Sequence, residues 1–400
     1  MQILRSILPL LRRSDGATSP SAMHRLSSPL RSLLSFTTST LPSWWPLRRV
    51  LPHNPATRRV CRFPHGSRSM ARSSGVKGWD AHMPGCPVDG VCPMAIFPKS
   101  SHHDGSMYKG RHAWKKEYRI ADRNQTWLEP MMLADPTDCC ILDGACMQHT
   151  PSGMFQIFSL KLGKIHVGCG PVELYGYIAM RDDLDRLLNY VVNFKRDDPI
   201  IVEQGSLINM AGPKRGIDSH GNILIEYDMR IKTAEEEKHD LQLIDGASVI
   251  VSKAMRNCHT FTSRIYGDCG AVDLTASRLE NAVEATLEVV ISEVQNSFNL
   301  CLSCFTSGLN EEIRLFNGTI GDSCGLKRSV VAVVMASWMM LKFKLGAESS
   351  SSAEHHCSFI ANDHGICIQK MKTDFALLSV KVTWSTLPRG CHAHSSSSQP

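Results

Sequence analysis

The stretch from Pro199 to Lys232 constrains the fold most, because its second half alternates strictly between apolar and polar side chains. Successive side chains of a β-strand point to opposite faces, so a period of two predicts a strand with one buried and one solvated face. The buried set is Ile225, Tyr227, Met229 and Ile231, and the solvated set is Glu226, Asp228, Arg230 and Lys232.

The first half of the same stretch predicts another strand and a turn. Residues Pro199–Val202 form a short apolar run that ends before Gly205, which is typical of a buried strand. Between the two strands, the segment Gly212-Pro-Lys-Arg-Gly216 combines glycine and proline, the residues that favour tight turns.

Further short alternating segments follow one another from Leu128 onward. The segment Arg278–Val294 fits both a helical stripe and a strand, but its β-branched run Val289-Val290-Ile291 favours a strand. Many short strands and little helix predict an all-β fold, an antiparallel β-sandwich, with a barrel as the near alternative. The other expected strands are Phe155–Leu162 (Phe158, Leu160 and Leu162 inward), Val172–Met180, Ala247–Val251, His259–Ile265, Phe298–Phe305, Ser329–Leu345 and Phe375–Trp384.

Composition changes along the chain and suggests four parts. Residues 1–79 are rich in Arg, Ser and Pro and poor in acids, which predicts a disordered extension, an organelle transit peptide, or sequence upstream of a start at Met70. Residues 80–127 are predicted to be an irregular linker with a short helix that carries Trp114, Tyr118 and Ile120 on one side. The strands occupy 128–387, and 388–400 is a disordered tail.

Charge and cysteine content exclude several classes of protein. The net charge of +6 arises in the first 80 residues, and the near-neutral remainder argues against a nucleic-acid surface. The 15 cysteines are scattered and odd in number, which favours reduced thiols in the cytoplasm or nucleus. A chloroplast or mitochondrion is the alternative if residues 1–70 are a transit peptide. No apolar run reaches the roughly 20 residues that span a bilayer, so we expect no membrane partner.

No catalytic residue, cofactor or metal site is expected. Cys86, Cys92, His102 and His103 fit no compact zinc spacing. The pair Cys301-Leu-Ser-Cys304 lies in strand-like sequence, where residues three apart face opposite ways, so plain thiols are favoured over a redox pair or half of a zinc site.

Two charged segments allow a binding role. Gly212, Lys214, Arg215 and Gly216 form a basic turn that we keep as a candidate anion site, although Pro213 removes a backbone donor and a plain turn is favoured. The acids of Arg181-Asp-Asp-Leu-Asp185 offer a cation site or paired carboxylates, but first-turn acids of a helix are favoured.

Several motifs, in this order and spacing, resemble a grass-expanded plant family of unknown function whose members carry a GPKRGI turn and an EYD-K-IK strand. The resemblance covers roughly Leu128–Leu387. It implies no established activity, but some family members are attached to ribosome-inactivating N-glycosidase domains, which implies a defence context. The motifs are Leu174–Asp185, Asn189-Tyr190, Arg196–Asp198, Gly212–Ile217, Ile225–Lys232, Ala282–Thr286 and Val380–Trp384.

These observations leave three functional hypotheses. The first is a non-enzymatic β-sandwich interaction module with an unidentified protein partner, based on the strand pattern and the absence of catalytic motifs. The second, which the resemblance implies, is a defence protein associated with rRNA N-glycosidase activity. The third is an anion or carbohydrate binder that uses the Lys214-Arg215 turn. The oligomeric state does not follow from the sequence.

Overall fold

The computed structural model describes residues 94–126, 134–143, 145–166, 168, 170–306, 309–346 and 352–388. The predicted extension at 1–79 and nearly all of the predicted tail lie outside these ranges. Antiparallel strands dominate the described residues, and none of their sheets closes into a barrel. The helical elements are α1 (Ala113–Glu117) and the 3₁₀ turns η1 (Ser106–Tyr108), η2 (Glu237–His239) and η3 (Ser252–Ala254).

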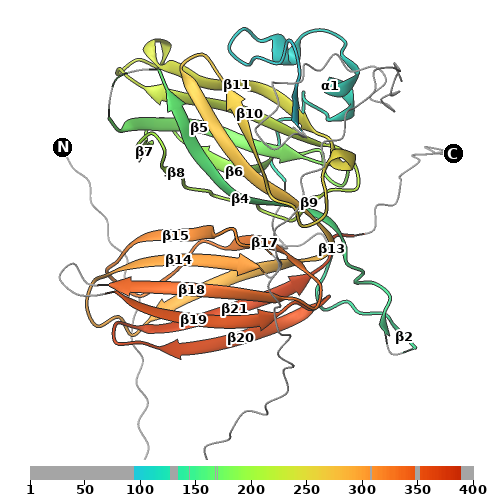
Figure 1. Ribbon diagram of the computed structural model, residues 1–400, viewed down its shortest axis with the longest axis vertical. Helices are drawn as coiled ribbons and strands as arrows, with labels where there is room; N and C mark the ends of the chain where they lie inside the picture. The colour runs from blue at the N-terminus through green and yellow to red at the C-terminus, as the bar shows by residue number, and fades with distance from the viewer. Residues whose placement is uncertain are drawn as a thin grey trace, which may run out of the picture. The chain divides into compact units, whose positions relative to one another are not determined.

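The described residues form three large sheets and a two-stranded one, β2 (Ile141–Leu142) with β3 (Ala145–Cys146), and every strand pairing within them is antiparallel (Figure 1). Sheet I has the order β1-β11-β10-β5-β6, with β7 also paired to β5. Its strands are β1 (Met94–Ile96), β5 (Val172–Arg181), β6 (Asn189–Phe194), β7 (Ile200–Val202), β10 (Ile223–Lys232) and β11 (Leu241–Ile250).

Sheet II has the order β20-β21-β13-β4-β8, and sheet III has the order β15-β14-β18-β19. The strands of sheet II are β4 (Ser152–Ile165), β8 (Leu207–Ile208), β9 (Ile217–Asp218), β12 (Phe261–Tyr266), β13 (Gly270–Ser292), β16 (Cys324–Gly325), β17 (Ser329–Val334), β20 (Gly365–Lys372) and β21 (Leu377–Ser385). Those of sheet III are β14 (Phe298–Thr306), β15 (Ile313–Ile320), β18 (Trp338–Gly346) and β19 (Ala353–Ile360).

Strand β13 connects two hydrophobic cores. Its first half pairs with β4 and β12, and their buried side chains pack with those of sheet I. Its second half pairs with β17 and β21, and the buried side chains there pack with those of sheet III. The prediction that Arg278–Val294 forms a strand is therefore confirmed as far as Ser292, where β13, a strand of 23 residues, ends. The two halves meet at Asn281, where φ is 53° and the pairing with β4 is interrupted.

The antiparallel sandwich predicted from the alternation is confirmed, and β10 buries its predicted face. Ile225, Tyr227, Met229 and Ile231 all belong to the core beneath sheet I. The expectation that Glu226 faces solvent is wrong, since its side chain is only 1% exposed. The reason is that the chain around α1 covers this part of the outer face of sheet I.

That cover has its own small core. Trp114 of α1 stacks on Phe97, with ring centroids 4.3 Å apart. Tyr118 and Ile120 are buried beside them, against apolar residues on the outer face of β10 and β11. The sequence predicted a helix with these residues on one side, and the structure limits it to five residues, Ala113–Glu117.

Three details of the strand predictions are wrong. Phe158 does not share a face with Leu160, because a bulge in β4 turns it into the core next to sheet III. Residues Ser329–Leu345 form two strands with a turn between them, where Ala336 has a φ of 59°. The run that ends at Val202 is an edge strand rather than a buried one, because Ile201 is 73% exposed. None of the described helices has the length and apolarity that crossing a bilayer requires.

Candidate metal centre

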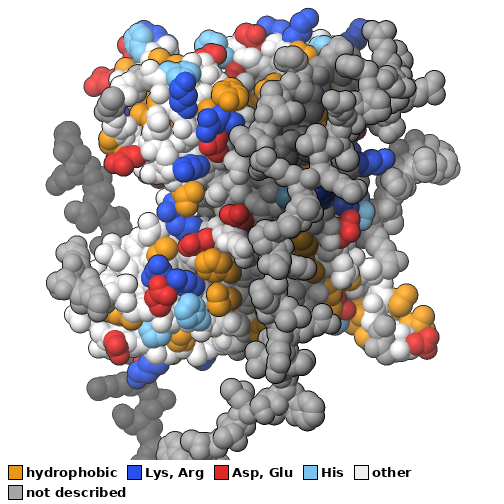
Figure 2. Space-filling model, in the orientation of Figure 1, with side chains coloured by type: hydrophobic (Ala, Val, Ile, Leu, Met, Phe, Trp, Pro, Cys, Tyr) orange, Lys and Arg blue, Asp and Glu red, His pale blue; other side chains and the backbone are white. Residues whose placement is uncertain are grey.

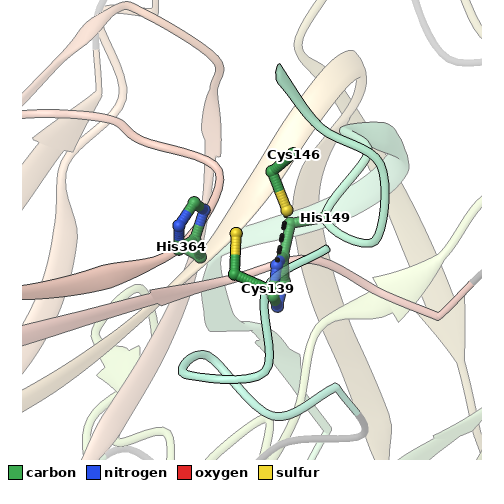
Figure 3. A group of neighbouring side chains, drawn as sticks. All are labelled: Cys139, Cys146, His149 and His364. Carbon is green, nitrogen blue, oxygen red and sulfur yellow. Dashed lines mark hydrogen bonds between the residues drawn. The ribbon is translucent and has the colours of Figure 1, made fainter. Parts of the chain in front are cut away.

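Four side chains with metal-binding atoms converge from two distant parts of the chain (Figure 3). They are Cys139, Cys146, His149 and His364, and their ligand atoms all lie within 4.8 Å of one another. Two thiols and two imidazoles are a donor set that proteins use for Zn²⁺. His149 is buried and the other three residues are half-buried, so the cluster lies at the surface with one ring inside the fold.

A small hairpin positions the first three residues. Strands β2 (Ile141–Leu142) and β3 (Ala145–Cys146) pair with each other, and the Met147 amide donates a hydrogen bond to the Cys140 carbonyl. Before the hairpin, Asp135 accepts hydrogen bonds from the backbone and hydroxyl of Thr137 and forms a turn. These local contacts fold the chain back on itself, so that Cys139 and Cys146 lie close together.

The ring of His149 is held with one nitrogen free for a metal. Its Nε2 lies 2.8 Å from the carbonyl oxygen of Asp135, and a carbonyl only accepts hydrogen bonds. Nε2 is therefore the protonated nitrogen, and the lone pair is on Nδ1, which points at Cys146 Sγ from 3.3 Å. Metal-binding histidines commonly have such a partner, which fixes their tautomer.

His364 reaches the same place from the connection between β19 and β20. Its Nδ1 lies 2.7 Å from Oδ1 of Asp363, which favours a proton on Nδ1 and leaves Nε2 as the lone-pair nitrogen. Its ring stacks on that of His149, with centroids 4.8 Å apart and planes 19° apart. A carboxylate behind a ligating imidazole is a frequent arrangement at zinc sites.

The distances suit a tetrahedral ion. Zn–S bonds of about 2.3 Å and Zn–N bonds of about 2.0–2.1 Å separate sulfur from nitrogen by about 3.6 Å in a tetrahedron. The 3.3 Å between Cys146 Sγ and His149 Nδ1 is close to this edge length. The ligand atoms of all four residues lie within 4.8 Å of one another, about 1 Å from the edge lengths of such a tetrahedron. The four residues therefore fit Zn²⁺.

The two thiols influence each other. A hydrogen bond from Cys139, with help from His149, lowers the pKa of the Cys146 thiol to about 6. The same hydrogen bond raises the pKa of Cys139 to about 11. One thiolate is thus favoured at neutral pH. A bound ion takes two thiolates, so metal uptake would release the proton of Cys139.

Four protein ligands complete a tetrahedron and leave no position for water or substrate. Catalytic zinc sites keep such a position open, whereas structural sites close it. An ion bound here would join the hairpin β2–β3 to the end of β19, more than 200 residues later in the chain. The arrangement thus supports cross-linking rather than catalysis.

Little in the sequence indicates this site, and no metal site was expected from it. Cys146 and His149 are separated by two residues, a spacing found in zinc sites, and this was the available local signal. Cys139 and His364 have no recognisable spacing from that pair, because the fold alone brings them close. Of the metal candidates weighed earlier, Cys86 and Cys92 lie outside the described residues, while His102 binds Glu226 and Asp245.

The residues of the turn that was predicted to bind an anion mainly make contacts within the fold. Arg215 is 1% exposed and donates hydrogen bonds to both carboxylate oxygens of Asp182, at 2.7 and 3.0 Å. At Gly212, a Cβ atom would lie 2.0 Å from the Tyr190 carbonyl oxygen, so glycine is required by backbone packing. Lys214 is half-buried, and its Nζ donates to Gln125 at a solvent-exposed contact.

Gly216 and the acidic residues that were considered as a cation site also make contacts within the fold. Gly216 donates its amide to Glu284, whose pKa is raised by burial. The segment that contains Asp182 and Asp185 is an irregular corner, and both acids lie against Arg215, so the predicted helix start is wrong. Ligand binding by the turn itself remains a prediction.

The cysteine pair of β14 behaves as its spacing predicted. Cys304 is buried in the core beside sheet III, whereas Cys301 lies on the other face with a weak contact to Ser303. Ten cysteines are described, and all of them are free.

Comparison with known proteins gives little information about activity. No curated protein matches the chain. Among solved structures, human GIVD cytosolic phospholipase A2 is similar over 59% of this chain and 33% of its own, with 7% identity and a TM-score of 0.20. The chain thus spans about a third of that protein. The calcium-bound pair of C2 domains of extended-synaptotagmin 2 is similar over 60% of this chain and 98% of its own, with 9% identity and a TM-score of 0.22.

A family model gives a definite assignment. The model of a domain of unknown function, DUF6598, matches residues 154–382, which is more than half of the chain and includes most of sheets I, II and III. This chain therefore belongs to the DUF6598 family.

Proposed function

We propose that this protein is a non-catalytic, zinc-stabilised β-sandwich module that presents its surface to a protein partner. The single observation that carries the proposal is the convergence of Cys139, Cys146, His149 and His364, with the outward nitrogen of each histidine already hydrogen-bonded. Closed sites of this kind stabilise folds and do not turn over substrate.

The free thiols support a reducing compartment. Zinc needs both cysteines as thiolates, and an oxidising compartment would favour a disulfide between Cys139 and Cys146 instead. We therefore propose the cytoplasm or nucleus, with an organelle as the alternative if residues 1–70 act as a transit peptide.

Metal analysis of the full chain tests the proposal. Protein purified without chelator is expected to contain about one zinc per chain, and Co²⁺ substitution should give the visible absorption bands of a tetrahedral site with thiolate ligands. Cys146→Ser and His364→Ala should each weaken zinc affinity at least tenfold, because each removes one of four ligands.

The matched control is Cys140→Ser. Cys140 is an exposed cysteine in the same hairpin and is not part of the cluster, so this variant should retain full zinc content. Equal loss of zinc in Cys140→Ser, or a Cys139–Cys146 disulfide in protein isolated from the cell under thiol-blocking conditions, would contradict the proposal.

The defence hypothesis rests on the family resemblance alone. We expect the protein to release no adenine from ribosomes in a depurination assay. Release that is lost on substitution of a single acid would replace the non-catalytic proposal with the N-glycosidase one.

A further inference from the structure

Two small hollows adjoin each other beside β15 and β17, far in sequence from the metal ligands. The first has a volume of about 40 Å³, and its lining includes Pro213, Arg314 and Lys327. The second has a volume of about 30 Å³. They share the lining residues Leu315, Lys327 and Ser329, so the two hollows lie side by side. A water occupies about 10–15 Å³ by the same measure, so each hollow has room for a group of a few heavy atoms.

The first hollow is strongly cationic. Its described lining contains Arg314, Lys327 and Arg328 and no acidic residue. Arg314 contacts neutral oxygens, the Leu207 carbonyl at 3.4 Å and the Asn209 amide at 3.2 Å. Arg328 also lines this hollow, and its Nε lies 3.7 Å from a carboxylate oxygen of Glu288.

Lys327 has no described carboxylate to balance its charge. Lys327 is a solvent-exposed residue, and its partial desolvation together with the positive charge of nearby Lys214 lowers its pKa. Lys214 itself is bonded to the neutral amide of Gln125. Cations held close together without acids repel one another, and a bound anion would relieve that repulsion.

The second hollow is apolar. Leu315, Phe316 and Leu326 are partly buried at its wall and pack against the core next to sheet III. The side chains of Leu287, Val289 and Leu302 form the rest of the wall. Figure 2 shows Lys and Arg side chains beside hydrophobic ones at the level of β15, with Asp and Glu side chains also nearby. Binding sites for small molecules commonly combine an apolar wall with a few charged groups that fix orientation.

We propose that these adjoining hollows bind a small amphiphilic anion. Its charged group, a phosphate or a carboxylate, lies in the first hollow beside Lys327 and Arg314, and its short apolar chain enters the hollow beside Leu326. Lys327, which lines both hollows, marks the junction between the two parts of the ligand. This site is separate from the zinc cluster, and the two proposals fail independently.

Titration of the full chain with four simple probes tests the proposal. Propyl phosphate and butyrate carry both features, inorganic phosphate has the charge alone, and propanol has the chain alone. Isothermal titration should show at least one of the two amphiphiles binding ten times more tightly than inorganic phosphate or propanol. The better amphiphile identifies the charged group. Equal affinity for all four probes, or no binding of either amphiphile, would overturn the proposal.

Charge reversal locates the site. Lys327→Glu should weaken binding of the better amphiphile at least tenfold. Lys370→Glu is the matched control, because Lys370 is exposed on β20, lines neither hollow and undergoes the same change of charge. Circular dichroism should show the same fold for both variants. An equal loss of binding in the two variants would overturn the assignment to Lys327.

Discussion

At the scale of single residues, the most informative contacts are those of His102. Its Nδ1 lies 2.6 Å from Asp245 and its Nε2 lies 3.2 Å from Glu226. Burial alone lowers the pKa of this imidazole, but the hydrogen bonds and charges of the two carboxylates outweigh burial and raise the pKa to about 9. The same contacts help to hold the pKa of Asp245 at about 2, against the effect of its burial.

This raised pKa predicts a specific dependence of stability on pH. With an unfolded pKa near 6.5, the protonated His102 stabilises the fold fully below about pH 6.5, and this contribution is lost as the pH rises through 9. The difference corresponds to about 3 kcal/mol. Urea unfolding between pH 6 and 10 should show this decline, and the decline should be smaller in His102→Gln. An identical pH profile in that variant would contradict the assignment.

The sequence predicted the inward face of β10 residue by residue but not the environment of Glu226. Alternation shows which side chains share a face, and it contains no information about which other segment covers that face. The same limit applies to the metal ligands. Cys146 and His149 are local and were accessible to a spacing argument, whereas His364 becomes a neighbour only through the pairing of β19 and β20 with other strands.

At the scale of secondary-structure elements, the small helix α1 matters because of what it covers. Trp114 is 2% exposed and stacks on Phe97 over the outer face of sheet I. Removal of the indole ring would leave a cavity beside the apolar side chains that the ring now covers. The short isolated helix has little stability of its own, so packing holds it in place.

We expect Trp114→Ala to lower the free energy of unfolding by about 3–5 kcal/mol, the range for loss of a buried aromatic side chain. Lys116→Ala, in the same helix but exposed, should change it by less than about 0.5 kcal/mol. Chemical denaturation measures both values. A similar effect of the two substitutions would show that α1 does not stabilise the sheet.

The sequence predicted the long strands correctly, but it did not predict the breaks and bulges within them. The β-branched run in β13 identified a strand, but a strand of 23 residues contains a break at Asn281 that no alternation indicates. The bulge in β4 is similar, since a single extra residue moves Phe158 to the other core. Bulges depend on pairing with a partner strand, which a single sequence does not specify.

At the scale of the whole described fold, β13 belongs to both cores. Its first half supports the core of sheet I and its second half supports the core of sheet III. If either core unfolds, β13 loses packing partners along half of its length. The two cores are therefore expected to unfold together.

Differential scanning calorimetry should therefore show one transition for the described domain. Leu174→Ala, in the core of sheet I, and Leu341→Ala, in the core of sheet III, should both shift that transition downward. Each costs about 2–5 kcal/mol, and each kcal/mol corresponds to a shift of about 2–4 °C in a domain of this size. Two separate transitions, each shifted by one variant alone, would contradict the coupling.

The cover over sheet I and three of the four metal ligands precede residue 154, where the family match begins. Trimming the chain to the matched stretch would strip Glu226 and Arg181 of their overlying partners, among them His102 and the carbonyl oxygens of Arg119 and Asp122. Water would then reach a charged pair set in an apolar surface. A shortened protein of this kind should be prone to aggregation, and its behaviour would say little about the intact molecule.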